Sequence, residues 1–326
     1  ETAQDTSGYL TLDRFNFNFV NEDELQTTLT QASEGPDGFA NSLKVQTTEP
    51  ESAVAADEEF RVIYKVEAQD LQQLKFGTSA AERITVSFYV RSSVAATYGF
   101  NLYQNDANKV NGQAYTINSA NTWERKTLTF IGNTSDVIND DNGIGIQLNW
   151  FLMAGSDYTS GSNNGWETFA TAKHAVGHNA NAVVTTTNAT WQITGVQLEV
   201  GSQATPFEHR SFAEEFTLCK RYFYSVLYRG GGYHSGNAAS FSLQQGMRLT
   251  GSDVSSAVLT VGTNKNGAVV KDGGTRAGHS MSAVALSSAT NTNNLVCSAT
   301  MNITLDSGDA AIGGGINLDV AIDMEL

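Results

Sequence analysis

Alternation of apolar and polar residues with a period of two is the feature that most constrains the fold of this chain. In one segment the apolar positions are Ile84, Val86, Phe88 and Val90, and more polar residues lie between them. A strand places successive side chains on opposite faces of a sheet, so such a segment buries one face and exposes the other. The pattern recurs at residues 60–66, 98–102, 144–150 and 191–200. Many strands with one wet face predict an antiparallel β-sandwich.

One of these segments contains a break in its alternation. Trp191 and Ile193 share a phase, but Val196 and Leu198 are displaced by one residue, and Gly195 lies at the slip. A β-bulge inserts one extra residue into a strand, and glycine is frequent at such positions. We therefore predict a β-bulge at Gly195.

A single segment has helical periodicity. Ser211 and Glu214 have the spacing of a capping box, and Phe212 and Phe216 follow at helical spacing. With 326 residues, of which 40% are hydrophobic, the chain is long enough for two domains. We expect an all-β protein of three parts: a jelly-roll β-sandwich over 1–210, a short connecting helix over 211–224, and a second, smaller β-sandwich over 225–326.

The charge balance excludes several classes of partner. The chain has 19 basic and 34 acidic residues, a net charge of −15. We expect no binding to nucleic acid, which requires a basic patch, and no binding to anionic membrane surfaces. No apolar run is long enough to span a bilayer, and the polar residues 1–10 show no signal peptide. Two distant cysteines, Cys219 and Cys297, predict reduced thiols.

Recognisable catalytic motifs are absent from the sequence, including the nucleophile elbow, the His-Glu-x-x-His motif and the phosphate loop. His174 and His178 would share a face only on a helix, and we interpret them as ordinary loop histidines rather than zinc ligands. Acidic residues are so numerous that no pair for glycoside hydrolysis can be singled out. We expect a chain that is not an enzyme.

Calcium is the one ion that the sequence suggests. Hard oxygen ligands are concentrated in one loop, at Asp136, Asn139, Asp140 and Asp141. Their spacing does not fit an EF-hand, and a polar turn is the alternative interpretation. We expect no other cofactor.

A sugar-binding site is suggested by two aromatic residues in a segment rich in serine, glycine and asparagine. Tyr158 and Trp166 could stack on the apolar faces of a sugar, and Asn163 and Asn164 could hydrogen-bond its hydroxyls. Core packing is the alternative role for the tryptophan. These four residues are the candidate glycan ligands.

Residues 193–201, with the sequence ITGVQLEVG, and residues 204–208, ATPFE, resemble a signature of tail fibre and other virion proteins of tailed bacteriophages. Residues 9–15 and 218–224 also resemble that family. The resemblance implies a carbohydrate-binding-module-like jelly roll and a location on a virion, at a tail fibre or on the capsid surface. It implies no defined sugar site, because the shared motifs look like scaffold. Relatives carry a segment before the Asp13-Arg14 pair, which indicates that a virion-anchoring region precedes Glu1.

The leading hypothesis is therefore a non-catalytic virion fibre or spike that binds a host surface polysaccharide and contacts other virion proteins. One alternative is a purely structural capsid or tail decoration protein. Another is a polysaccharide depolymerase or the binding module of a glycoside hydrolase. The resemblance also implies a homotrimer. The thin apolar content of residues 262–282 agrees, since a domain with a small core depends on neighbours for stability.

Overall fold

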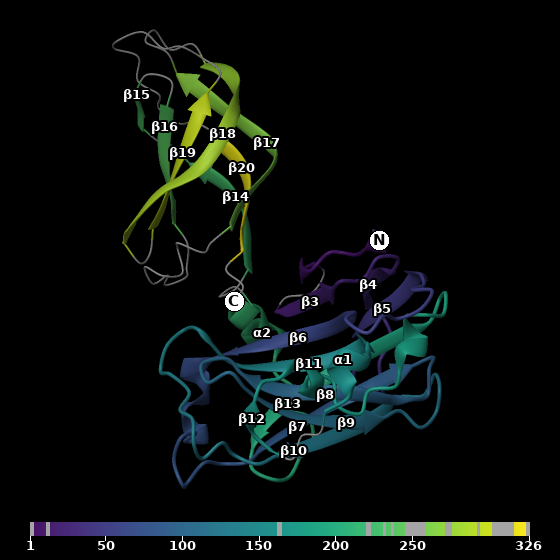
Figure 1. Cartoon of the computed structure of the whole chain (residues 1–326). Coiled ribbons are helices and arrows are strands. Elements are labelled where there is room, and N and C mark those ends of the chain that lie inside the picture. The colour runs from purple at the N-terminus through teal and green to yellow at the C-terminus, as the bar shows by residue number, and fades with distance from the viewer. Residues whose placement is uncertain are drawn as a thin grey trace. The chain divides into compact units, whose positions relative to one another are not determined.

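A computed structural model describes residues 3–10, 14–161, 165–219, 223–230, 233–235, 238–244, 258–270, 276–291, 294–301 and 316–323. Its contacts divide the chain into two compact units, residues 1–209 and 210–325, beside the expected boundary at residue 210. Figure 1 draws the first unit from purple to teal and the second from green to yellow. Strands dominate both units and the helices are short, which confirms the all-β class. None of the helices in the described part has the length and apolar content that a membrane-spanning helix needs.

The first unit is a sandwich of two antiparallel sheets. Its strands are β1 (Ala3–Gln4), β2 (Gly8–Tyr9), β3 (Phe15–Val20), β4 (Gln26–Ala32), β5 (Ser42–Glu49), β6 (Glu59–Glu67), β7 (Ile84–Ser92), β8 (Thr97–Gln104), β9 (Lys109–Thr116), β10 (Glu124–Phe130), β11 (Ile144–Ala154), β12 (Glu167–Thr168) and β13 (Thr190–Val200). Its short helices are η1 (Ala68–Leu74), α1 (Ser156–Thr159), η2 (Thr171–Lys173) and η3 (Asn181–Val183).

Within the described residues, six strands form one sheet in the order β1-β4-β5-β13-β7-β10, and seven form the other in the order β12-β9-β8-β11-β6-β3-β2. The chain crosses repeatedly between them: β5 belongs to the first sheet, β6 to the second, β7 to the first and β8 to the second. Such crossings are typical of a jelly roll.

The core lies between the two sheets and follows the predicted alternation. Ile84, Val86, Phe88 and Val90 are all fully buried. The ring of Phe88 meets Trp150 of the opposite sheet edge to face, with centroids 5.7 Å apart. Each large apolar side chain buried in this way stabilises the fold by about 1.5–3 kcal/mol.

The predicted bulge in β13 is confirmed. The pairing of β13 with β7 shifts register between Thr194 and Gln197, and Gly195 has a φ of 59°. A side chain at Gly195 would also meet the ring of Phe39, because an added Cβ would lie 2.7 Å from its Cζ atom. Glycine is therefore required by both conformation and space.

The second unit begins with α2 (Phe212–Cys219), followed by antiparallel strands. Their order in the sheet is β14-β20-β17-β18-β19-β16-β15. The bounds are β14 (Phe223–Gly230), β15 (Tyr233–Ser235), β16 (Ala238–Gln244), β17 (Val258–Val270), β18 (Arg276–Asn291), β19 (Asn294–Met301) and β20 (Ile316–Asp323). The first part of β18 pairs with β17 and the remainder with β19.

The predicted capping box begins α2, but the helix is shorter than expected. Ser211 Oγ donates to Glu214 Oε2 at 2.8 Å, and the Glu214 N–H donates to Ser211 Oγ at 3.3 Å. Phe223 and Tyr224, which we predicted to end the helix, instead begin β14 and pair with Asp323 and Ile322. Pairing with a neighbouring strand outweighs the helical pattern that precedes these aromatic residues, which have high strand propensity.

Candidate binding face

Polar side chains line the outer surface of the seven-stranded sheet of the first unit, on the side away from the core. Because side chains alternate along a strand, Val62 and Phe100 are buried in the core while their neighbours turn outward. We call this surface the polar face. The residues that define it are Asn16 and Asn18 on β3, Arg61 and Lys65 on β6, Asn101 and Tyr103 on β8, and Gln147 and Asn149 on β11.

The described parts of the connection between β11 and β13, residues 155–161 and 165–189, cover part of the polar face. The Asn101 amide donates to the backbone oxygen of His174 at 2.6 Å, and the Gly99 N–H donates to His178 Nδ1 at 3.2 Å. A Cβ at Gly99 would lie 3.2 Å from the backbone of Ala175. Glycine at this position therefore lets the connection lie directly on the sheet.

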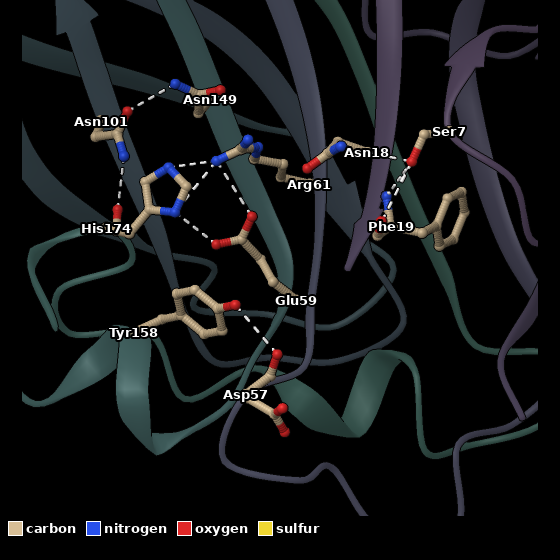
Figure 2. Close-up of polar contacts among 10 residues, drawn as sticks. All are labelled: Ser7, Asn18, Phe19, Asp57, Glu59, Arg61, Asn101, Asn149, Tyr158 and His174. Atoms are coloured by element: carbon tan, nitrogen blue, oxygen red, sulfur yellow. Dashed lines mark hydrogen bonds and ion pairs between the residues drawn. The ribbon is translucent and has the colours of Figure 1, made fainter. Parts of the chain in front are cut away.

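Beneath this connection, Glu59, Arg61 and His174 form a buried, charge-compensated cluster (Figure 2). Arg61 Nη1 lies 3.2 Å from Glu59 Oε1, and Glu59 Oε2 lies 2.6 Å from His174 Nδ1. Arg61 Nη1 also contacts His174 Nε2. Arg61 Nη1 also lies 3.1 Å from His174 Nδ1, so the guanidinium and the carboxylate both contact the imidazole.

Burial and the neighbouring charges shift the pKa values of this cluster. Burial lowers the pKa of His174, an effect that Glu59 opposes and Arg61 reinforces. Burial also lowers the pKa of Arg61, and Glu59 opposes that change. A neutral imidazole between one carboxylate and one guanidinium gives a net charge of zero. The contacts of His174 with this pair of charges fix the connection to the sheet.

Three buried polar atoms of the polar face have no hydrogen-bond partner in the described part of the chain: Asn18 Oδ1, Arg61 Nε and Asn149 Oδ1. The amide of Asn149 donates to Asn101 Oδ1 at 2.7 Å, which leaves only its own oxygen unused. Asn18 and Arg61 are register partners on adjacent strands. An unsatisfied buried polar atom costs about 1–3 kcal/mol, so these three atoms lower the stability of the fold.

Another part of the polar face is a half-buried strip between two tyrosines. Lys65 pairs in register with Gln147, and Gln147 pairs with Tyr103 on β8. The ammonium of Lys65 lies 5.1 Å from the ring centre of Tyr9, on edge strand β2. The hydroxyl of Tyr103 donates to Asn108 Oδ1 at 2.9 Å. Polar groups between aromatic rings are the combination that a sugar requires.

The aromatic residues expected to bind sugar are tied to the protein itself. Trp166 Nε1 donates to the backbone oxygen of Ile131 at 2.6 Å, and its ring packs edge to face against Phe76 with centroids 5.5 Å apart. Tyr158 donates to the backbone oxygen of Asp57 at 3.1 Å, and burial raises its pKa. These contacts favour the core-packing role for Trp166, and they place the two rings in different surroundings. Asn163 and Asn164 lie outside the described residues.

In the loop expected to hold calcium, two of the carboxylates accept hydrogen bonds from the loop itself. Asp136 Oδ2 accepts from the Asn133 amide at 3.1 Å, and Asp141 Oδ1 accepts from the Gly143 N–H at 2.9 Å. In the described part of the chain, the carboxylates of Asp136, Asp140 and Asp141 are not found as a convergent group, and the Asn139 N–H donates to Asp106 Oδ2 at 3.0 Å. Among the described residues, three carboxylates converge elsewhere, at Asp23, Glu51 and Glu58.

The two loop histidines are buried rather than exposed. His178 Nδ1 accepts from Gly99, so Nε2 carries the proton and donates to Asn181 Oδ1 at 3.0 Å. Burial lowers the pKa of His178 to about 4. The ring is therefore neutral at pH 7 and acts as a spacer between the connection and β8.

No protein-family model matches the sequence, and no curated protein matches it. Similar solved structures include the enzymatically active domain of bacteriophage CBA120 tailspike protein 4, at 9% identity and a TM-score of 0.31 over 57% of this chain. The chain covers 19% of that domain. A family 11 carbohydrate-binding module from Clostridium thermocellum, in complex with a β-1,3-1,4-mixed-linked tetrasaccharide, has 10% identity and a TM-score of 0.32 over 58% of this chain and 89% of the module.

The CBM22-1-CBM22-2 tandem domain of Paenibacillus barcinonensis Xyn10C is also similar, with 10% identity and a TM-score of 0.28 over 94% of this chain and 85% of that one. At such low identities and TM-scores, function has to be argued from the residues of this chain.

Proposed function

We propose that the chain is a non-catalytic glycan-binding protein and that a polysaccharide binds along the polar face. The observation that carries the proposal is the strip from Tyr9 through Lys65 and Gln147 to Tyr103, in which two aromatic rings flank polar groups. Sugar hydroxyls both donate and accept hydrogen bonds, and sugar rings present flat apolar faces to aromatic side chains.

A binding role suits the polar face better than glycoside hydrolysis. Hydrolysis in most families needs two carboxyl groups about 5–9.5 Å apart across the scissile bond. Glu59, the acid at the outward position of β6 beside Arg61, is engaged by Arg61 and His174. A carboxylate held in this way is a poor proton donor or nucleophile.

We further propose that the protein is located on a virion. The sequence resemblance to tailed-phage virion proteins supports a place on a tail fibre or capsid surface, a host surface polysaccharide as ligand, other virion proteins as neighbours, and a homotrimeric assembly. Light scattering on the purified chain tests the assembly: a trimer mass is expected, and a monomer mass at micromolar concentration would contradict it for this chain.

Binding can be tested with a glycan array and a matched pair of variants. Gln147→Ala removes a half-buried glutamine from the polar face, and Gln46→Ala, the control, removes one from the other sheet. The two side chains are comparable, because Gln147 donates to an asparagine oxygen at 3.4 Å and Gln46 donates to another at 3.2 Å. Losing one hydrogen bond of about 0.5–1.5 kcal/mol should weaken glycan binding roughly 2- to 10-fold in Gln147→Ala and leave Gln46→Ala unchanged.

Equal affinity for the two variants would contradict a site on the polar face. Release of reducing ends from a bound polysaccharide would favour the depolymerase alternative. Binding to no glycan would favour the decoration alternative.

A further inference from the structure

Three carboxylates that are distant in the sequence converge at one end of the first unit. Asp23 lies between β3 and β4, and Glu51 and Glu58 lie between β5 and β6. One carboxylate oxygen of each lies within 4.8 Å of the other two. Both connections cross from one sheet to the other, so the group joins two crossings of the sandwich.

Two of the three acids are almost completely buried, and one has an orphaned oxygen. Glu51 is 2% exposed and Glu58 is 4% exposed. Glu58 Oε2 accepts the Ala55 N–H at 2.7 Å, but Glu51 Oε2 has no hydrogen-bond partner in the described part of the chain. The Glu51 N–H donates to the backbone oxygen of Val184 at 3.0 Å, which fixes the residue in place. A carboxylate is not normally buried without a partner.

The surroundings add negative charge rather than relieving it. Glu22 and Glu24 flank Asp23 in the sequence and add two further carboxylates to the same connection. Among the described residues, no ion pair joins Asp23, Glu51 or Glu58 to a basic side chain. The group therefore lacks the cation that its charge requires.

We propose that Asp23, Glu51 and Glu58 bind a divalent cation, and that the ion is calcium. Calcium takes six to eight oxygen ligands at about 2.3–2.6 Å, so two ligands of one ion lie no more than about 5 Å apart, a limit that these three oxygens meet. Zinc prefers nitrogen and sulfur, and magnesium requires a nearly ideal octahedron. Water completes the coordination on the side of the exposed Asp23.

The ion cross-links two sheet crossings at the point where β6 begins. Glu58 immediately precedes Glu59, and its backbone oxygen accepts the Gly155 N–H at 2.9 Å, at the start of the connection over the polar face. Bound calcium therefore stabilises the entry to β6 and the foot of that connection. This role is independent of whether the polar face binds a glycan.

Isothermal titration of the chelator-treated full chain with calcium chloride tests the site. We expect one binding event per chain, at least tenfold weaker in both Glu51→Gln and Asp23→Asn. Asp23 is exposed, so its variant tests the site even if Glu51→Gln fails to fold. Asp141→Asn, in the calcium loop suggested by the sequence, is the control and should bind as the wild type does.

Calcium should also raise the melting temperature of the wild type and of Asp141→Asn by several degrees, with a smaller shift in Asp23→Asn. Magnesium chloride should give weaker binding than calcium chloride. Absence of binding at millimolar calcium, tighter binding of magnesium, or unchanged binding in Asp23→Asn would each overturn the proposal.

Discussion

Glu58 and Glu59 are neighbours at the start of β6 and both are nearly completely buried, yet their surroundings are opposite. Glu59 meets a guanidinium at 3.2 Å and an imidazole at 2.6 Å. Glu58 meets two further carboxylates, from Asp23 and Glu51. Burying a charge is tolerated only when it is paired or coordinates an ion. The comparison separates a cluster that the chain neutralises itself from one that requires a cation from solution.

The largest effect is expected from removing the cation of the compensated cluster. Arg61→Ala leaves Glu59 buried without a guanidinium, which should lower the free energy of unfolding by about 3–5 kcal/mol. Arg91→Ala is the control, because Arg91 pairs with the more exposed Glu34 at 2.7 Å and should cost about 1 kcal/mol or less. Urea denaturation measures both. Equal costs would show that the Glu59 cluster is not a buried ion pair.

The next effect is a dependence of stability on pH through His178. Its pKa is about 4 in the folded chain against 6.5 for an unperturbed histidine, so the unfolded chain binds more protons between these values. Stability should therefore fall as the pH falls from 6.5, by about 3 kcal/mol at pH 4 from this residue alone. Denaturation of the wild type and His178→Gln across this range isolates the contribution. Parallel pH profiles would contradict the buried, neutral ring.

A smaller effect, of opposite sign in the two clusters, is expected from neutralising a single glutamate. In the presence of chelator, Glu51→Gln should stabilise the fold by about 1 kcal/mol, since it removes one of three like charges that lie within 4.8 Å of one another. Glu59→Gln should destabilise it, because it leaves Arg61 without its carboxylate. Thermal unfolding of both variants measures the signs. A loss of stability in both would remove the distinction between the clusters.

The smallest effect on stability is expected at the open strip of the polar face. Gln147→Ala and Gln46→Ala should each change the free energy of unfolding by about 0.5 kcal/mol or less, because both side chains are half-exposed and loosely bonded. Denaturation midpoints check this. A loss well above 1 kcal/mol in Gln147→Ala alone would show that the strip has a structural role. Destabilisation of the fold would then account for any loss of glycan binding.

Local patterns were sufficient to predict the strands, the bulge at Gly195 and the capping box of Ser211 and Glu214. Each depends on neighbours in the sequence, and the structure confirms them. The polar face could not be predicted in this way. Glu59 and Arg61 occupy positions that alternation assigns to the wet face, and the connection that buries them has no periodicity of its own.

The two acidic regions also show that local sequence does not predict which side chains meet in space. Asp136 and Asp141 are close in the sequence, but neighbouring residues in a turn point apart, and each finds its own partner. Asp23 and Glu51 are far apart in the sequence and meet only because two crossings between the sheets end side by side. A density of acids along the chain is therefore a poor guide to where carboxylates converge.

Locating the ion by diffraction tests the distinction between the two clusters most directly. Crystals of the chain grown with calcium and measured at a long wavelength should show one strong anomalous peak bounded by oxygens of Asp23, Glu51 and Glu58, at about 2.3–2.6 Å. Glu59 and Arg61 should remain paired with no ion between them. A peak in the loop of Asp136 and Asp141, or a lysine or arginine found against Glu51 in place of an ion, would contradict the account.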